Sequence, residues 1–302
     1  MSDSSAGLRR KIGSAGELRS VVRTMKAVAA SSIVQYERSV AALADYLRTI
    51  ELGLSASFRE DGLTPAPARA AASPAAGASG PTRSGAIGAI VFGSDQGLVG
   101  QFNDAIAIHA VNTLAAVSGP VQVWAVGERV QARLAATGFA ATGVFAVPAS
   151  VAAITVLVAQ ILVQAEAFAA SDLAAELYLF YNRPTMGAIY TPATERLLPL
   201  DAAWRRGLMQ RDWPTHMLPE VLGAATTTLR ALIGEYLFVS LFRACAESLA
   251  SENASRLAAM QRAEKNIDEL LVAMNASFHR LRQSSIDEEL FDVVSGFEAV
   301  SQ

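Results

Sequence analysis

Few residues in this chain have the types and spacing that catalysis or metal binding requires. The three histidines, His109, His216 and His279, lie far apart in the sequence, and none stands at metal-ligand spacing from cysteine or carboxylate residues. The single cysteine, Cys245, lies on the apolar side of a helical pattern without a basic neighbour in sequence to activate its thiol. The sequence therefore predicts no metal site and no catalytic thiolate.

Two other patterns imitate a functional site. The acidic residues Asp287, Glu288, Glu289 and Asp292 have the types of a paired-carboxylate site, but at a helix end such a cluster is usually a solvated or partner-facing surface. The loop at residues 94–103, SDQGLVGQFN, places glycines directly after an apolar run, as nucleotide-binding loops do. It lacks G-x-G-x-x-G, and the chain nowhere contains G-x-x-x-x-G-K-[ST]. We therefore predict a structural turn there, no catalytic residue and no cofactor.

The elements that must position any functional side chain are dominated by a stretch near the C-terminus. From Met217 to Gly296 the only proline is Pro219, and apolar residues recur at helical spacing, which predicts one very long helix beginning near Pro219 and stopping at Gly296. A stripe along it steps by alternating threes and fours, as coiled-coil seams do. The stripe consists of Leu257, Met260, Glu264, Ile267, Leu271, Met274, Phe278 and Leu281.

A second long, proline-free helix is predicted from Gly7 to about Phe58, and we expect it to pair with the C-terminal helix. Its stripe consists of Leu18, Val22, Met25, Ala29, Ser32, Tyr36, Ser39, Leu43, Tyr46 and Ile50. Its first half is basic, and such a surface attracts acidic proteins, anionic lipid or nucleic acid. The net charge of −3 gives no overall reason to expect nucleic acid.

Between these helices, short apolar runs alternate with helical patterns. Strands are predicted at 86–92, 121–126 and 176–181, helices at 104–117, 128–136 and 150–169, and an edge strand interrupted by Pro192 at 189–200. This alternation predicts a parallel sheet. Residues 147–165 carry no charge and approach the length of a membrane span. Their alanine content and glutamines favour a helix buried between the sheet and other helices, so no integral membrane segment is expected.

The predicted fold class is α/β, with a long antiparallel coiled coil of N- and C-terminal helices and a small Rossmann-like parallel-sheet domain. The predicted boundaries are an N-terminal shaft helix at 1–60, an Ala/Pro-rich linker at 61–85, an α/β domain at 86–214 and a C-terminal shaft helix at 215–302.

Four separated motifs resemble the gamma subunit of rotary F-type ATP synthases. Residues 23–31, RTMKAVAAS, are similar to that family's K-A-M-x-M-V-A-A-[AS], and residues 94–103 to S-D-R-G-L-C-G-x-[LF]-N. Residues 247–260, ESLASENASRLAAM, are similar to E-x-x-A-S-E-x-A-A-R-M-x-A-M. Residues 282–286, RQSSI, with 289–300, are similar to the ending R-Q-x-x-I-T-x-E-[IL]-x-E-I-V-x-G-A-x-A-[LV]. The motifs follow the family's order across nearly the whole chain.

The resemblance implies a noncatalytic central-stalk rotor that transmits torque between a membrane ion-driven ring and a catalytic hexamer. It implies that the paired helices enter the hexamer of alpha and beta subunits, and that the α/β domain contacts the epsilon subunit and the membrane c-ring. A peripheral place on the cytoplasmic side of a bacterial membrane is expected. By motif match, the expected partner contacts are Arg23, Met25, Lys26, Arg282, Gln283 and Glu289. For Met25, packing in the helix seam is an equally good interpretation.

Departures from the family pattern indicate a divergent lineage. Ser32 to Gln35 stand where basic residues are usual, Gln96 replaces an arginine, Val99 a cysteine, and Asp287 a threonine. The alternative sodium-linked bacterial F-type ATPases are one candidate lineage. Two other functions remain open from the residues, namely a dinucleotide-dependent enzyme with helical arms and a coiled-coil adaptor unrelated to rotation.

Overall fold

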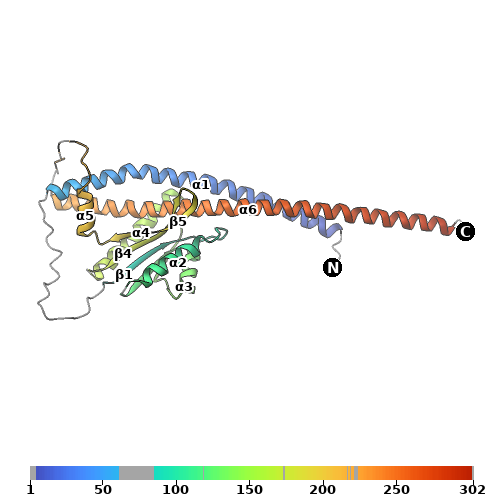
Figure 1. The fold of residues 1–302 in the computed structure, drawn as a ribbon, viewed down its shortest axis with the longest axis horizontal. Helices are drawn as coiled ribbons and strands as arrows, with labels where there is room; N and C mark the ends of the chain where they lie inside the picture. The colour runs from blue at the N-terminus through green and yellow to red at the C-terminus, as the bar shows by residue number, and fades with distance from the viewer. Residues whose placement is uncertain are drawn as a thin grey trace. The chain divides into compact units, whose positions relative to one another are not determined.

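The computed structural model describes residues 5–60, 85–117, 119–172, 174–215, 217, 219–220 and 224–300. The chain divides into two compact units, one holding the described residues up to 31 and from 256 onward, called here the end unit, and one holding residues 32–255, the body unit. Helices α1 (Ser5–Glu60) and α6 (Ala225–Val300) each have one part in each unit (Figure 1). Residues 61–84 of the linker predicted at 61–85 lie outside the described residues.

The body unit contains a five-stranded sheet in the order β3-β2-β1-β4-β5. Strands β1 (Ile87–Phe92), β2 (Val121–Val126), β3 (Gly143–Phe145) and the start of β4 (Glu176–Thr185) are mutually parallel. They are joined by α2 (Phe102–Ala115), α3 (Glu128–Ala136) and α4 (Val151–Ser171), with α5 (Ala202–Met209) following the last strand. This order is that of a doubly wound, Rossmann-like sheet.

Every residue of β1 is buried, because helices cover both faces of the sheet. Ile87, Ala89 and Val91 face a core formed with α2 and α3, whereas Ile90 and Phe92 face a second core formed with α4 and α6 (Figure 1). The α6 segment in that second core consists of Leu241, Phe242, Ala244, Cys245, Ala246, Leu249 and Ala250. The long helix is therefore part of the globular core as well as of the helix pair.

One sheet prediction is wrong in part. Strand β5 (Ala188–Leu198) is antiparallel to β4, so the sheet is mixed. No helix separates these two strands, and a tight turn at Met186 and Gly187, with a positive φ of 90° at the glycine, returns the chain at once. Pro192 does not interrupt β5, because it lies opposite Asn182 in an edge strand, where a missing N–H is tolerated. Short elements β3 and α5 were not predicted.

The ends of the C-terminal helix also differ from the prediction. Helix α6 begins at Ala225, beyond Pro219, and runs through Gly296 to Val300. A single glycine in a long helix costs only about 1 kcal/mol relative to alanine, so it need not end the helix.

From Leu8 to Ile50, the burial pattern of α1 follows a heptad. The buried apolar positions of this part recur at multiples of seven residues, which keeps one stripe toward a partner helix. They are Leu8, Ala15, Val22, Ala29, Tyr36 and Ile50, whereas Leu54 and Ala56 are buried outside this stripe. Four members of this stripe were predicted, but Leu18 and Tyr46 are 54% and 46% exposed. The predicted Met25, Ser32 and Ser39 are half-buried, and so are Ile12, Arg19, Lys26 and Ile33, which were not predicted.

Helix α4 is the one described helix long and apolar enough to cross a membrane, with a mean hydropathy of 1.9 in its most apolar window. Ser150 caps its first turn by accepting a hydrogen bond from the Ala153 amide. One face packs into the core through Ile154, Leu157 and Val158, while Val156 and Val163 on the other face are more than half exposed. The predicted burial against the sheet is confirmed for the first face.

Candidate partner-binding surface

The N-terminal residues predicted to contact partners lie beside α6 within the end unit. Arg23 Nε donates to Glu264 Oε1 at 2.7 Å, and Lys26 Nζ donates to the other oxygen of the same carboxylate at 2.5 Å. These bonds hold the pKa of Glu264 below its ordinary value, with Lys26 the larger cause and Arg23 next. Met25 packs against the cluster of Val22, Met260 and Ile267, so the seam interpretation of Met25 is the one its surroundings support.

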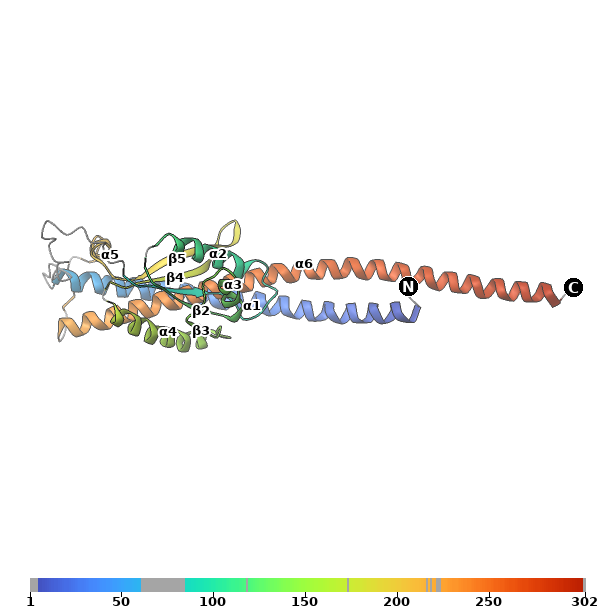
Figure 2. The same ribbon diagram turned by 90° about the horizontal axis from the view of Figure 1, so that it is seen from below.

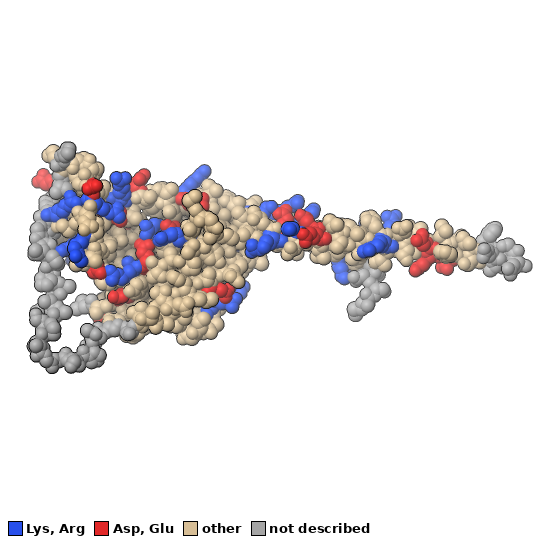
Figure 3. Space-filling view, in the orientation of Figure 1, with Lys and Arg blue, Asp and Glu red and all other residues tan. Residues whose placement is uncertain are grey.

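A third cross-helix pair extends this arrangement. Arg19 Nη1 donates to Asp268 Oδ1 at 3.0 Å, one turn of each helix further along. Arg23 stays 56% exposed despite its bond to Glu264, whereas the Glu264 side chain is only 15% exposed. Figure 3 shows these basic and acidic side chains gathered together on the helix pair. Arg23 therefore still presents its guanidinium to the surroundings.

The C-terminal residues predicted to contact partners lie on a part of α6 that is exposed on all sides. Every residue from His279 to Ser295 is exposed, including Arg282, Gln283 and Glu289. Within the end unit, α6 continues past the N-terminal end of α1 (Figure 2). Among the described residues no second helix lies beside this stretch, which explains why its side chains are not buried against the rest of the chain.

This uncovered stretch is amphipathic. Ile286, Leu290, Val293 and Val294 are 48% to 71% exposed and recur at spacings of four, three and one, so they form one stripe. Glu288 and Asp292 fall on the opposite side of the helix, whereas Glu289, three residues after Ile286 and four before Val293, borders the stripe. Acidic side chains are visible near the C-terminal end of the described helix in Figure 3. Exposed apolar stripes of this kind mark interaction sites.

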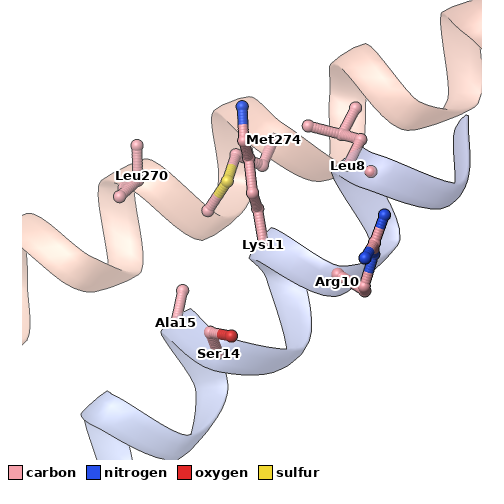
Figure 4. A pocket seen from close by; sticks show the side chains of 8 residues that line it. Leu8, Arg10, Lys11, Ser14, Ala15, Leu270 and Met274 are labelled. Carbon is pink, nitrogen blue, oxygen red and sulfur yellow. The ribbon is translucent and has the colours of Figure 1, made fainter. Parts of the chain in front are cut away.

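A groove between α1 and α6 lies at the start of α1, and no sequence pattern predicted it. It has a volume of about 780 Å³ and is lined by Leu8, Ala15, Leu270 and Met274, with Arg10, Lys11 and Ser14 around them. Figure 4 shows Leu270 and Met274 of α6 across from Leu8, Lys11 and Ala15 of α1. Glycines and small residues on α1 at this point leave the two helices incompletely filled. The surface is apolar with a basic margin.

The glycine-containing loop after β1 is a structural turn whose anion-binding place is already filled. Asp95 accepts hydrogen bonds at 2.9 Å from the amides of Glu128, the first residue of α3, and Val147. The Asp95 carboxylate therefore occupies the N-terminal end of α3, where another anion could otherwise bind. Gly127 has φ of 112°, and a Cβ there would lie 2.7 Å from the Ser94 carbonyl oxygen, so the turn closes tightly.

Two of the four sequence motifs meet in the body unit. Ser255 on α6 donates from Oγ to the Val99 carbonyl oxygen at 2.5 Å, and Ser251 and Glu252, one turn earlier, are buried. Val99 belongs to the loop at the carboxyl end of β1, beside the point where the strand order reverses and where doubly wound sheets bind ligands. Helix α6 packs on that edge, which explains why both motifs belong to one structural feature.

The other candidate chemical groups take structural positions. Cys245 is buried. Burial is the larger cause that raises the pKa of its thiol, and the nearby Glu252 carboxylate is the smaller one. His109 shares a 2.8 Å hydrogen bond with Thr194, His279 is exposed on α6, and His216 lies outside the described residues. Within the described ranges no group of three or more histidine, cysteine or acidic side chains could hold a metal ion.

The sequence pattern of the ATP synthase family matches residues 4–300. The chain belongs to the ATP synthase family. Two curated relatives are both ATP synthase gamma chains: that of Syntrophus aciditrophicus (strain SB) is 34% identical over 131 residues, and that of Xanthomonas campestris pv. campestris (strain B100) is 28% identical over 217 residues. The first match covers 42% of this chain and 43% of the relative, the second 71% and 74%.

Solved structures of this family share the fold. A chain of the Euglena gracilis mitochondrial ATP synthase, described with its OSCP, F1 and c-ring parts, superposes with a TM-score of 0.61 at 16% identity, covering 98% of this chain and 94% of that one. A central-stalk chain of the Tetrahymena thermophila mitochondrial enzyme gives 0.52 at 18% identity, covering 80% and 99%. The gamma-subunit resemblance and the predicted combination of terminal helices with an α/β domain are confirmed.

Proposed function

We propose that this chain is the central-stalk rotor subunit of an F-type ATP synthase, carrying torque between a membrane ion-driven ring and an alpha/beta hexamer without performing chemistry itself. The observation that carries the proposal is an exposed apolar stripe on the part of α6 that extends beyond the start of α1. The stripe consists of Ile286, Leu290, Val293 and Val294. An exposed apolar stripe bordered by acidic side chains fits an enclosing protein surface. Under this proposal, the enclosing protein is the alpha/beta hexamer.

The predicted contact residues divide into two roles under this proposal. Arg282, Gln283 and Glu289 contact the hexamer, since they lie on the uncovered stretch. Arg23 contacts it with the exposed side of its guanidinium, whereas Met25 and Lys26 fix the pairing of α1 with α6 that presents Arg23. The groove between Leu8 and Met274 adds an apolar and basic surface to the same end unit.

The body unit supplies the opposite contacts. We propose that it meets the epsilon subunit and the c-ring, which places the chain at a membrane periphery, on the cytoplasmic side of a bacterial cell. The helix pair supports a noncatalytic role, because its heptad spacing serves packing. The glycine-containing loop after β1 serves structure as well, because its Asp95 binds the amides of Glu128 and Val147.

Co-expression with the alpha and beta subunits encoded beside this chain tests the proposal. Native mass measurement is expected to find one copy of this chain with three alpha and three beta subunits, and ATP hydrolysis that depends on the chain. A chain that stayed free while alpha and beta assembled would end the rotor proposal in favour of the coiled-coil adaptor.

Removal of residues 286–302 tests the stripe itself. Because residues 286–295 are exposed, we expect the midpoint of thermal unfolding of the body unit to stay unchanged, while hexamer association or coupled turnover falls. Replacement of Val272, which is 71% exposed on α6 outside the stripe, by alanine is the matched control. An equal loss of body-unit stability would contradict the assignment.

A further inference from the structure

Four charged side chains form a closed ring between the sheet and α6. Arg183 lies on β4 and Glu195 on β5, while Arg243 and Glu247 lie one turn apart on α6. Arg243 Nη2 donates to both oxygens of Glu195 at 2.8 Å, and Arg183 Nε donates to Glu247 Oε2 at 3.0 Å. The remaining two sides are Arg183 to Glu195 at 3.7 Å and Arg243 to Glu247 at 4.0 Å. We call these four residues the charge ring.

The ring is electrically balanced and mostly shielded from water. Two arginines alternate with two glutamates, so every charge has an opposite charge on each side. The side chains of Glu247, Glu195 and Arg243 are 13%, 22% and 28% exposed, whereas Arg183 is 48% exposed. Ion pairs at such depth are screened less by salt than pairs on the open surface.

Tyr181 hydrogen-bonds to two members of the charge ring. Its side chain is fully buried, its hydroxyl donates to Glu195 Oε2 at 3.2 Å, and the same hydroxyl accepts a hydrogen bond from Arg183. The Arg183 guanidinium also lies 5.3 Å from the centre of the Tyr181 ring. Tyr181 therefore fixes the positions of the two sheet members of the charge ring relative to each other.

The alternation of charge selects one position of the helix along the sheet. Each element contributes one positive and one negative side chain, and the two cross-links between them point in opposite senses. A slip of α6 by one turn, about 5.4 Å, would bring Glu247 beside Glu195 or Arg243 beside Arg183. Like charges would then meet in a partly shielded site, so sliding in either direction is opposed.

The apolar contacts around the ring hold α6 against the sheet. The neighbouring α6 residues in the core include small side chains, Ala244, Ala246 and Ala250, and large ones, Leu241, Phe242 and Leu249. To this packing the ring adds a charge pattern that opposes a slip of one turn in either direction.

We propose that Arg183, Glu195, Arg243 and Glu247 form a register lock that keeps α6 fixed against the sheet while torque passes between the body unit and the shaft. This inference rests on the proposed rotor function, and it assigns these four side chains as positioning residues for torque transmission. Loss of the ring leaves the hexamer contacts of the end unit intact but allows the sheet to slip along α6 within the body unit.

The test compares ATP hydrolysis with ATP-driven ion pumping in the complete complex in vesicles. The first variant carries Arg183→Gln, Glu195→Gln, Arg243→Gln and Glu247→Gln, which removes every charge but keeps polar groups. The second reverses the ring with Arg183→Glu, Glu195→Arg, Arg243→Glu and Glu247→Arg, which restores the alternation. The matched control, Asp104→Asn with Arg133→Gln, removes an ion pair of 3.0 Å between α2 and α3 in the same unit.

We expect the uncharged variant to hydrolyse ATP at a near-normal rate while ions pumped per ATP fall roughly threefold or more. The reversed ring is expected to pump like the wild type, as is the control. Normal pumping per ATP by the uncharged variant would overturn the register lock. If that variant does not fold, the reversed ring decides: normal coupling supports the lock, and lost coupling in a folded complex overturns it. If ATP hydrolysis by the complex does not depend on the wild-type chain, that result counts against the rotor function and not against the register lock.

Discussion

At the scale of single residues, Glu264 is the acidic residue on which the helix pair depends most directly. Two cations from α1, Lys26 and Arg23, bind its two oxygens and hold its pKa below the ordinary value of 4.5. A carboxyl group with a lowered pKa in the folded state stabilises that state above its unfolded pKa, and the stabilisation is lost as the pH falls through the folded pKa.

We therefore expect the thermal stability of the wild-type chain to fall as the pH drops below about 4.5, and Glu264→Gln to be less stable at neutral pH and less sensitive to acid. Far-ultraviolet circular dichroism at a series of pH values measures both. Glu269→Gln is the matched control, because its side chain is 67% exposed and pairs only at 3.9 Å with Lys265 on its own helix. Parallel acid curves for the wild type and Glu264→Gln would show that the bridge contributes nothing.

Cys245 gives a second prediction at this scale. Its side chain is 1% exposed and its thiol pKa is raised by burial, so little thiolate exists and reagents cannot reach it. Alkylation of the native chain by iodoacetamide is expected to be at least about tenfold slower than alkylation of the denatured chain. Comparable rates in the two states would place the thiol at an accessible position.

At the scale of elements, burial along α1 makes a sharp distinction between two leucines. Leu54 is 0% exposed in a cluster with Ile50, Leu208 and Val239, whereas Leu18 is 54% exposed. Leu54→Ala is expected to lower the free energy of unfolding by about 2–5 kcal/mol, and Leu18→Ala by less than about 0.5 kcal/mol. Denaturant titration of the full chain measures both, and equal losses would contradict the observed seam.

The same helix shows where prediction from sequence stops. The stripe through Val22, Ala29, Tyr36 and Ile50 was predictable, because every seventh residue is apolar or small. On the second flank the predicted Met25, Ser32 and Ser39 are half-buried, but Leu18 is exposed while the neighbouring Arg19 is half-buried, because apolar periodicity favours leucine over arginine. Arg19 and Lys26 lie half-buried because their long stems cover apolar surface while their charged ends reach Asp268 and Glu264.

The sheet and the site show the same limit. Strand β2 and helix α3 were predicted at their observed ends, because apolar runs and glycine punctuation mark them clearly. The antiparallel β5 was not, since the parallel rule requires a connecting helix that is missing there. The charge ring and the groove join residues from distant parts of the chain, and no local pattern announces such contacts.

At the scale of the whole molecule, the two units differ in how much apolar surface they bury. The end unit has one small cluster around Val22, Met260 and Ile267, whereas the body unit has three larger clusters. We expect amides of 5–31 and 256–278 to exchange with solvent at least about 100-fold faster than those of β1 and β4. Hydrogen exchange with mass spectrometry on the isolated chain measures this, and binding to the hexamer is expected to slow the end unit selectively.

Uniform protection across both units in the isolated chain would contradict this division. The expected contrast also fits the proposed rotor function, because a helix pair that gains its stability from a surrounding sleeve need not be rigid without it.

The pairing of α1 with α6 sets a timing problem during synthesis. The residues that bridge the two helices in the end unit are separated by 238 to 249 positions in the chain. At roughly 5–20 residues per second, a ribosome adds that many residues in about 12–50 seconds. During this interval the heptad edge of α1 has left the ribosome while its complementary helix does not yet exist. The emerging chain therefore stays soluble until translation is nearly finished only if chaperones bind this edge or if aggregation is slower than synthesis.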